Sequence, residues 1–268
     1  QSGTFVADDI GMRFQDNRQE QSFNAYICQQ IARLKRLGKI RTSETYTAAF
    51  RSFNGFMNDK EVLFNQISAD LIAEYEAYLK GRGNSPNTIS FYMRVLKAGY
   101  NRAVEDGLTG QRHPFKSVYT GMEKTLKRAI SLNDLKRIKG LDLSLKPNLD
   151  FARDMFLFCF YTRGMSFIDM AYLRKKDLQN GILSYRRRKT GQQLFIKWER
   201  CMQEIVDKYP INETEYLLPI ITKRNKDYRK QYTNELHRVN HLLKKIGKQL
   251  DLSIPLTMYV GRHSWASI

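Results

Sequence analysis

The sequence predicts a mainly α-helical protein of two domains, the second of which carries one small antiparallel β-sheet. Three observations lead to this prediction. Apolar residues recur at helical spacing through most of residues 23–100. The helical period is lost between residues 115 and 128, which places a domain boundary there. Two short runs rich in β-forming residues, 182–188 and 194–198, flank the turn residues Thr190-Gly191.

The first half of the chain contains the signals of four helices. Residues 1–19 have no clean period and are interpreted as a linker or expression remnant, so the first domain is expected to span residues 20–114. Ser85 gives the clearest helix start, because its hydroxyl can cap a helix whose first position is Pro86. The expected helices run over residues 23–37, from Thr42 or Ser43 through Met57, from just after Ser68 to the Gly81–Gly83 stretch, and from Ser85 to Gly107.

The second domain is expected to span residues 129–268, after a basic interdomain linker at residues 115–128. Ser131 and Asp134 form a variant of the capping box, with Asp in place of Glu, and mark the start of its first helix. The other expected elements are helices at 148–161, after Ser166, at 200–208 and at 225–250, and strands at 182–188 and 194–198 joined by a tight turn.

The composition indicates a polyanionic partner. The formal charge is +18, from 45 Lys and Arg against 27 Asp and Glu. This excess favours nucleic acid over a membrane surface, although a basic protein with a merely solvated face would show the same total. No stretch is apolar enough for a membrane helix. Cys28, Cys159 and Cys201 lie far apart without a C-x-x-C pair, so neither disulfides nor a zinc site is expected, Cys159 is expected in the core, and a reducing cytoplasm fits.

Two segments carry candidate chemistry. Residues 185–191 hold four consecutive basic residues at the end of a strand, which can follow a phosphate backbone or can simply form a soluble turn. Residues 256–266 place Tyr259 and Arg262 three positions apart, so on a helix both side chains lie on one face. Taken alone, this second segment is equally well explained as an ordinary buried helix start.

In their order and spacing, these segments resemble the catalytic domain of the tyrosine-type site-specific DNA recombinases, a family that includes the integrases of mobile elements. Lys189 matches the family's lysine on a β-hairpin, residues 259–263 match its His-x-x-Arg-His box, and residues 163–173 match its upstream arginine box. The first half resembles the family's four-helix, SAM-like core-binding domain, with residues 85–89 at the matching helix start and residues 113–115 before the linker. The resemblance covers roughly residues 20–268, and the variant residues are most similar to integrases of Bacteroides-type mobile elements.

The resemblance implies cleavage of one DNA strand by a tyrosine, which leaves a 3′-phosphotyrosyl bond and a free 5′-hydroxyl. Protein cations must then neutralise the charge on the phosphate oxygens. By position, Arg262 would clamp the phosphate and Lys189 would be the general acid for the leaving oxygen. No cofactor or metal is required. The implied partners are double-stranded DNA and further copies of the chain, as a homotetramer on two DNA sites in the bacterial cytoplasm at the nucleoid.

This sequence departs from the family pattern at three places. Ser166 stands where the upstream box normally has arginine, and Arg163, one helical turn earlier, is expected either to replace it or to bind a flanking phosphate. Tyr259 replaces the first histidine of the second box and is interpreted as a phosphate ligand. His263 is expected at the catalytic site in a structural or supporting role and not as a proton shuttle. The nucleophilic tyrosine is expected beyond Ile268, so the chain as given is expected to bind DNA without cleaving it.

Further residues are expected along a DNA track, although each basic residue taken singly is often just solvated. The helix starts at residues 42–45 and 85–88 are expected to donate backbone N–H groups to phosphates. Two other functions remain open: a non-catalytic DNA-binding regulator on the same fold, and a type IB topoisomerase. The expected DNA-binding residues are Arg41, Thr42, Thr45, Ser85, Asn87, Thr88, Arg94, Lys97, Arg186, Arg187, Arg188, Lys223 and Arg224.

Overall fold

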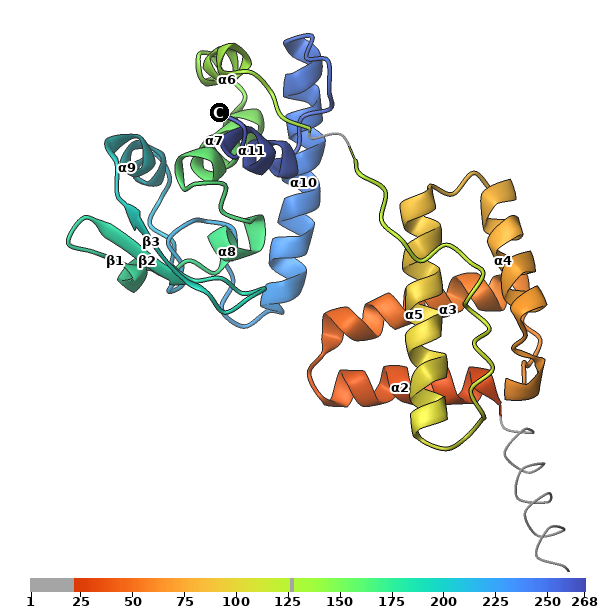
Figure 1. Cartoon of the computed structure of the whole chain (residues 1–268). Coiled ribbons are helices and arrows are strands. Elements are labelled where there is room, and N and C mark those ends of the chain that lie inside the picture. Colours follow the sequence, from red (N-terminus) through yellow and green to blue (C-terminus); the bar gives the residue numbers. More distant parts are fainter. Residues whose placement is uncertain (1–21, 126–127) are drawn as a thin grey trace, which may run out of the picture. The chain divides into compact units, whose positions relative to one another are not determined.

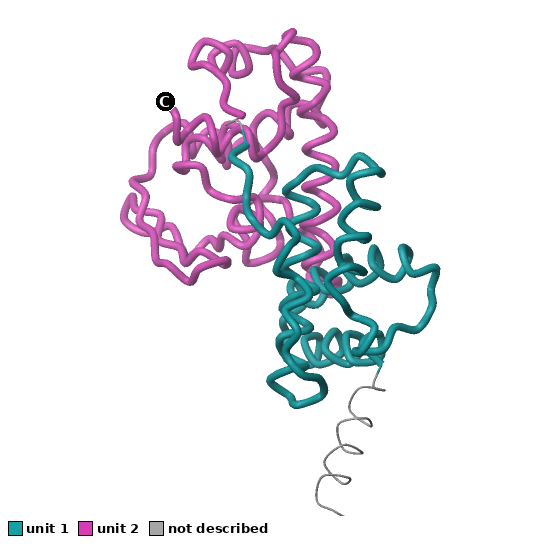
Figure 2. The backbone as a smooth tube through the Cα atoms, turned by 45° about the vertical axis from the view of Figure 1, so that its right-hand side comes forward, with its two compact units in different colours: residues 1–125 teal, residues 126–268 magenta. Residues whose placement is uncertain are grey.

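The computed structural model describes residues 22–125 and 128–268. The chain divides into two compact units, residues 1–125 and 126–268 (Figure 2). The expectations for residues 1–19 and for residues 126–127 of the linker fall outside the described residues. Within the described parts of the chain, no helix combines the length and the hydrophobicity that crossing a membrane requires.

The first unit is a helical bundle (Figure 1). Serine residues cap three of its helices: the hydroxyl oxygens of Ser22, Ser68 and Ser85 accept backbone N–H groups three residues later. The sequence predicted the helix starts at Ser68 and Ser85. Its elements are α2 (Phe23–Arg36), α3 (Ile40–Phe56), a short 3-10 helix η1 (Phe64–Gln66), α4 (Ala69–Gly81) and α5 (Pro86–Glu105).

Helix α3 begins at Ile40, so the predicted start at Thr42 or Ser43 was too late. Hydroxyl groups at and just after the predicted start bond instead to carbonyls one turn back: Ser43 donates to the Ile40 oxygen at 2.7 Å, and Thr45 to the Arg41 oxygen at 2.8 Å. Thr42 therefore lies in the first turn, but Thr45 lies inside the helix. The expectation that the backbone N–H of Thr45 is free at a helix start was wrong.

An aromatic cluster forms the core of the first unit. The ring of Phe23 meets those of Phe53 and Phe64 edge to face, at centroid distances of 6.0 and 5.6 Å. Phe115 and Val118 are buried in the same core, although the sequence suggested a linker from residue 115. A segment without a helical period can still bury single apolar side chains, and residues 115–118 therefore belong to the packed part of this unit.

The second unit combines helices with a three-stranded antiparallel sheet of order β1-β2-β3 (Figure 1). Strands β2 and β3 confirm the predicted hairpin, in which Ser184 pairs with Phe195. The two-residue strand β1 was not predicted, because so short a strand has no readable period. The elements are α6 (Leu132–Lys139), α7 (Pro147–Tyr161), α8 (Phe167–Ala171), η2 (Lys175–Asp177), β1 (Leu178–Gln179), β2 (Ile182–Arg186), β3 (Gln193–Lys197), α9 (Arg200–Asp207), α10 (Tyr228–Gln249) and α11 (Met258–Trp265).

Helix α7 is the centre of the second unit and packs against α6, α9, α10 and α11. Helix α11 approaches it closely through Gly261, where a Cβ atom would lie 3.1 Å from the ring of Phe156. Ser264 fixes the same helix to the start of the unit, because its hydroxyl oxygen accepts the backbone N–H of Ile130 at 3.0 Å. These contacts set the position of the helix that carries Tyr259 and Arg262.

Candidate functional site

A pocket of about 630 Å³ in the second unit brings together segments that are far apart in the sequence. We call it the cationic pocket, because Arg187, Lys189 and Arg262 line it and no Asp or Glu does. The start of α8, the β2–β3 turn, α10 and α11 all contribute to its wall. The complete lining is Met165, Ser166, Phe167, Ile168, Arg187, Lys189, Leu236, Asn240, Thr257, Met258, Tyr259 and Arg262.

Two N-terminal hydrogen bonds position α11 at the pocket. The Thr257 hydroxyl oxygen caps the helix by accepting the Val260 N–H at 3.4 Å. The side-chain oxygen of Asn240, on α10, accepts the Met258 N–H at 2.9 Å. Tyr259 and Arg262 lie three residues apart on this helix and both line the pocket, as their spacing predicts. Asn240 was missed from the sequence, because one asparagine among the many polar residues of a long amphipathic helix gives no functional signal.

His263 lies one helical turn after Tyr259 on α11. Its ring meets the ring of Tyr259 edge to face at a centroid distance of 4.3 Å. His263 is half-buried and is not among the residues that line the cationic pocket. Tyr259 itself is 64% exposed, so its phenol can reach a large ligand from solvent.

The β2–β3 turn is wider than the predicted tight turn at Thr190-Gly191, since the strands end at Arg186 and resume at Gln193. The backbone N–H of Arg187 donates to the Gln192 oxygen, and that of Gly191 donates to the Arg187 oxygen, both at 2.8 Å. Gly191 has a φ of +70°, which suits glycine. Residues 187–189 are therefore held in a closed turn and do not continue the strand.

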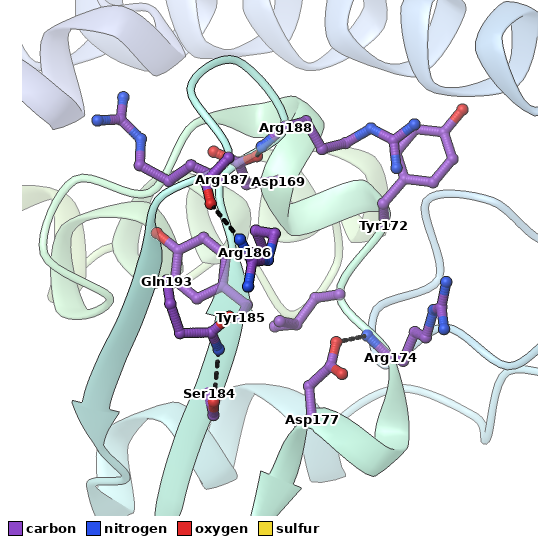
Figure 3. A pocket seen from close by; sticks show the side chains of 12 residues that line it. Asp169, Tyr172, Arg174, Asp177, Ser184, Tyr185, Arg186, Arg187, Arg188 and Gln193 are labelled. Atoms are coloured by element: carbon purple, nitrogen blue, oxygen red, sulfur yellow. Dashed lines mark hydrogen bonds between the residues drawn. The ribbon is translucent and has the colours of Figure 1, made fainter.

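The consecutive basic residues of this turn have different surroundings. Arg186 donates from Nη1 to the Gly191 oxygen at 2.8 Å. The guanidinium of Arg188 lies over the ring of Tyr172, 3.8 Å from its centroid. In Figure 3 the side chain of Arg188 extends toward Tyr172, whereas that of Arg187 extends away from it. Arg187 and Lys189 line the cationic pocket, and Arg186 and Arg188 do not.

Asp169 fastens this turn to the start of α8. Its carboxylate accepts the Ser166 hydroxyl at 2.6 Å and the backbone N–H of Arg188 at 2.9 Å. Asp169 is only 4% exposed, so its carboxylate accepts hydrogen bonds from groups of the protein and not from solvent. Ser166 is also the N-cap of α8. Ser166, which replaces the arginine of the resembling family, therefore has a local structural role at the wall of the pocket.

The cations of the pocket have no anionic partner among the residues that the structure describes. Among residues 22–125 and 128–268, the side chains of Arg187, Lys189 and Arg262 make no hydrogen bond and no ion pair. Arg187 and Arg262 are nevertheless half-buried. Both act on the phenol of Tyr185, whose pKa burial raises to about 12 while the two guanidinium groups pull it down. The positive charge of the pocket is therefore not neutralised by these residues, which favours the binding of an anion.

Arg163 lies near this site but outside its wall. It follows the end of α7, is exposed, and has a φ of +58°. The next residue, Gly164, has a φ of +69°, and a Cβ atom on it would lie 3.2 Å from Cγ of Arg262. The backbone beside Arg163 thus contacts Arg262, while the Arg163 side chain is not part of the pocket lining.

Cys159 lies beneath the same region and is a core thiol, as predicted. It is 1% exposed, and burial raises its pKa to about 12, an effect that the charge of Arg262 opposes. A thiol of such a pKa is almost entirely protonated at neutral pH, so it is a poor nucleophile.

The predicted DNA-binding residues at the start of α5 are occupied by local contacts. The hydroxyl oxygen of Ser85 accepts the Thr88 N–H at 3.4 Å. The Asn87 side chain donates to the Glu123 oxygen at 3.1 Å and accepts the Glu123 N–H at 2.9 Å. Asn87 therefore holds the segment after the bundle against α5.

The predicted cations of the first unit lie on its surface or in shallow sites. Arg41 pairs with Glu44 at 3.4 Å with a side chain that is 89% exposed. Arg94 donates from Nε to the Ser90 oxygen at 3.4 Å. Lys97 lines a separate pocket of about 450 Å³ together with other residues of the first unit, among them Asn101, Gln111, His113, Pro114, Phe115 and Lys116.

Lys223 and Arg224 lie in the loop before α10 and do not line the cationic pocket. The backbone N–H of Lys223 donates to the side chain of Gln231 at 3.0 Å. The guanidinium of Arg224 donates from Nε to the Glu213 oxygen at 2.9 Å. Both residues therefore brace their own loop.

Comparisons with known proteins agree with this architecture. Residues 22–128 match the family model of the phage integrase SAM-like domain. No curated protein sequence matches the chain. Among solved structures, a lambda integrase dimer bound to a COC′ core site is 14% identical with a TM-score of 0.71, over 99% of this chain and 74% of that one.

Two further solved structures extend the comparison. A lambda integrase tetramer bound to a Holliday junction is 16% identical with a TM-score of 0.70, over 99% of this chain and 77% of that one. The Tn1549 transposon integrase in complex with transposon right end DNA is 16% identical with a TM-score of 0.63, over 92% and 86%. At these identities the likeness shows the fold: a SAM-like integrase domain followed by a helical unit with a small antiparallel sheet.

Proposed function

We propose that this chain is the DNA-binding and phosphate-activating part of a site-specific recombinase of the tyrosine type. The observation that carries the proposal is the cationic pocket, where Lys189, Tyr259 and Arg262 converge from two separate segments. Within residues 22–125 and 128–268, none of the three has a carboxylate partner. The fold around it is similar to that of integrases whose solved structures contain DNA. A polyanion explains both the pocket and the net charge of +18.

In the proposed reaction the phenolate of a tyrosine attacks the phosphorus of a DNA phosphodiester. A bond from that oxygen to phosphorus forms, and the bond to the 5′-oxygen breaks. Lys189 transfers a proton to the leaving 5′-oxygen, which becomes a hydroxyl. Arg262 binds the non-bridging oxygens, and Tyr259 donates a hydrogen bond to them. The reverse reaction joins a 5′-hydroxyl from another strand and releases the tyrosine, so no cofactor is consumed.

The nucleophile is proposed to lie beyond Ile268, where the resembling family carries it. The proposed substrate is duplex DNA, and the proposed assembly is a homotetramer on two DNA sites. One lambda integrase structure is described as a tetramer bound to a Holliday junction, which supports that arrangement by analogy. Ser166 and Tyr259, the departures from the family pattern, support a place among integrases of Bacteroides-type mobile elements.

A DNA-binding regulator without catalysis is the second candidate. Ser166 favours it, because its hydroxyl donates to Asp169 and serves as a helix cap in place of a catalytic arginine. A regulator needs the basic surface but not a general acid. The two candidates therefore differ in whether Lys189 affects chemistry or only binding.

Covalent trapping separates these candidates. The protein, extended by its natural reading frame past Ile268, is incubated with a pool of nicked duplexes of varied sequence, in which the cut fragment diffuses away after cleavage. We expect a covalent adduct that survives denaturing electrophoresis, with the DNA 3′-phosphate on a tyrosine located by mass spectrometry. Specific binding without any adduct would leave the regulator as the function.

A further inference from the structure

Arg187 occupies a position that its neighbours in the turn do not share. It is half-buried, whereas Arg186 and Arg188 are exposed. Arg186 is engaged by the Gly191 oxygen and Arg188 by the ring of Tyr172. Arg187 has its backbone closed into the turn at both its N–H and its oxygen. The position of its Cα is thus fixed, while its guanidinium has no partner among the described residues.

A half-buried guanidinium without a counter-ion is costly, and a second one nearby adds repulsion. Charged side chains that leave water are normally paired, because desolvation favours the neutral form and arginine cannot lose its proton. Arg187 and Arg262 line the same pocket, and their charges act on the same buried phenol. An anion between them would remove the repulsion and supply the missing hydrogen-bond acceptors.

Arg163 is the rival for this role, since it lies three residues before Ser166, in the turn between α7 and α8. Its side chain is exposed and does not line the cationic pocket. Arg187 does line this pocket and belongs to the turn that Asp169 fastens to α8. The same hydrogen bond that holds Lys189 in the turn therefore also holds Arg187.

We propose that Arg187 is the second phosphate-binding guanidinium of the cationic pocket and provides the charge that Ser166 does not. This inference rests on the proposed function, because it names a further residue of the same site. Arg187 and Arg262 would each direct N–H donors to the non-bridging oxygens of one phosphate, with Lys189 beside the bridging oxygen.

The test uses inorganic phosphate as the probe on the intact chain labelled with nitrogen-15. Two-dimensional NMR follows the Nε–Hε signals of arginines while phosphate is titrated at constant ionic strength set by sodium chloride, so that screening does not change. We expect the signals of Arg187 and Arg262 to shift together with one dissociation constant. Arg187→Ala should weaken phosphate binding about tenfold, since charge-assisted hydrogen bonds are lost.

Matched variants make the outcomes distinct. Arg200→Ala removes an equal charge from an exposed, ion-paired site on α9 and should leave the phosphate affinity within about twofold. Arg187→Gln keeps a flexible polar stem and should weaken binding as Arg187→Ala does, which preserves the test if the alanine variant does not fold. Lysine at this position keeps the charge but not the paired N–H donors, so the phosphate affinity of Arg187→Lys should lie between those of the wild type and of Arg187→Ala.

Each contrary result has its own meaning. If Arg187→Ala binds phosphate like wild type while Arg262→Ala does not bind it, Arg187 is not a ligand, and the proposed function stands without it. If Arg163→Ala weakens binding and Arg187→Ala does not, the second guanidinium is Arg163 and this inference is wrong. If phosphate shifts neither the Arg187 nor the Arg262 signal, the pocket binds no phosphate, and the proposed function falls with it.

Discussion

The carboxylate of Asp169 accepts the backbone N–H of Arg188 at 2.9 Å, although the two residues belong to different elements. The same carboxylate accepts the Ser166 hydroxyl at the start of α8. Through this one buried side chain, the basic turn between β2 and β3 is fixed relative to the wall of the cationic pocket. The placement of Lys189 and Arg187 therefore depends on a residue that has no direct part in the chemistry.

Asp169→Ala should loosen the basic turn. We expect the free energy of unfolding to fall by about 2–3 kcal/mol, because two hydrogen bonds to a buried carboxylate are lost. Asp169→Asn should cost less, since its side-chain oxygen can still accept the Arg188 N–H. Chemical denaturation gives the stability, and hydrogen exchange at the Arg188 amide reports the turn directly. Asp142→Ala, which removes an exposed turn acceptor, is the control; equal losses for Asp142→Ala and Asp169→Ala would contradict the role of Asp169.

Lys189→Ala should impair cleavage far more than binding. In the protein extended past Ile268, we expect the cleavage rate to fall about 10²–10⁴-fold, the usual contribution of a positioned general acid. A substrate with sulfur in place of the leaving 5′-oxygen needs no proton from the enzyme and should restore most of the rate. Lys197→Ala removes an exposed lysine on β3 and should cleave normally. Equal losses on the oxygen and sulfur substrates would exclude Lys189 as the acid.

Tyr259→Phe should slow cleavage about tenfold, because a neutral hydrogen bond to the phosphate is lost while the ring and its contact with His263 remain. Tyr259→His restores a donor at the same position and should recover most of the rate. Single-turnover cleavage of a nicked duplex is the measurement. A complete loss of the covalent adduct in Tyr259→Phe would instead make Tyr259 the nucleophile.

Gly164→Ala should disturb the backbone of Arg262. The φ of Gly164 is +69°, and a Cβ atom at this residue would lie 3.2 to 3.4 Å from atoms of Arg262. Gly38 has the same φ of +69° with nothing within 4 Å of a Cβ atom, so Gly38→Ala isolates the conformational cost of about 1 kcal/mol. We expect Gly164→Ala to cost more than Gly38→Ala in thermal unfolding and to weaken phosphate binding as well. Identical costs with unchanged phosphate affinity would show that Arg262 tolerates the methyl group.

DNA binding should weaken steeply with salt. Binding that neutralises several phosphates releases counterions, and six to ten such contacts would lower the affinity by about 10³–10⁵ between about 50 and 200 mM salt. Fluorescence anisotropy with a short labelled duplex measures this slope. An affinity that stays flat over the same range would rule out a binding surface built on phosphate contacts.

Local chemistry made much of the helical framework predictable. Ser68, Ser85 and Ser131 were identified as helix starts, and each hydroxyl oxygen accepts an N–H three residues later. Capping pairs such as these are close in the sequence, so the pattern carries them directly. Where hydroxyl groups bonded backward to carbonyls, as in α3, the same residue types gave a helix start that was too late.

The composition of the pocket was only partly predictable. Tyr259 and Arg262 share a helix face, and Lys189 was identified through the family that the sequence resembles. Arg187 was placed with its neighbours in one basic stretch, and nothing in the sequence distinguishes it. Its burial depends on how the turn between β2 and β3 closes and on where Asp169 holds it.

The sequence by itself determined the helices and the hairpin, because each depends on residues within a few positions of one another. It also determined the basic character and the order of the family-like segments, because both can be read from the sequence without any folded contact. The tertiary structure decided which cations share the pocket and which are occupied elsewhere. That choice depends on contacts between α8, α10, α11 and the β2–β3 turn, which lie far apart along the chain. Packing on α7 places α10 and α11, α8 packs against α10, and the Asp169 hydrogen bond joins the turn to α8. Hydrophobic burial can join segments at any distance along the chain, so these contacts leave no local pattern in the sequence.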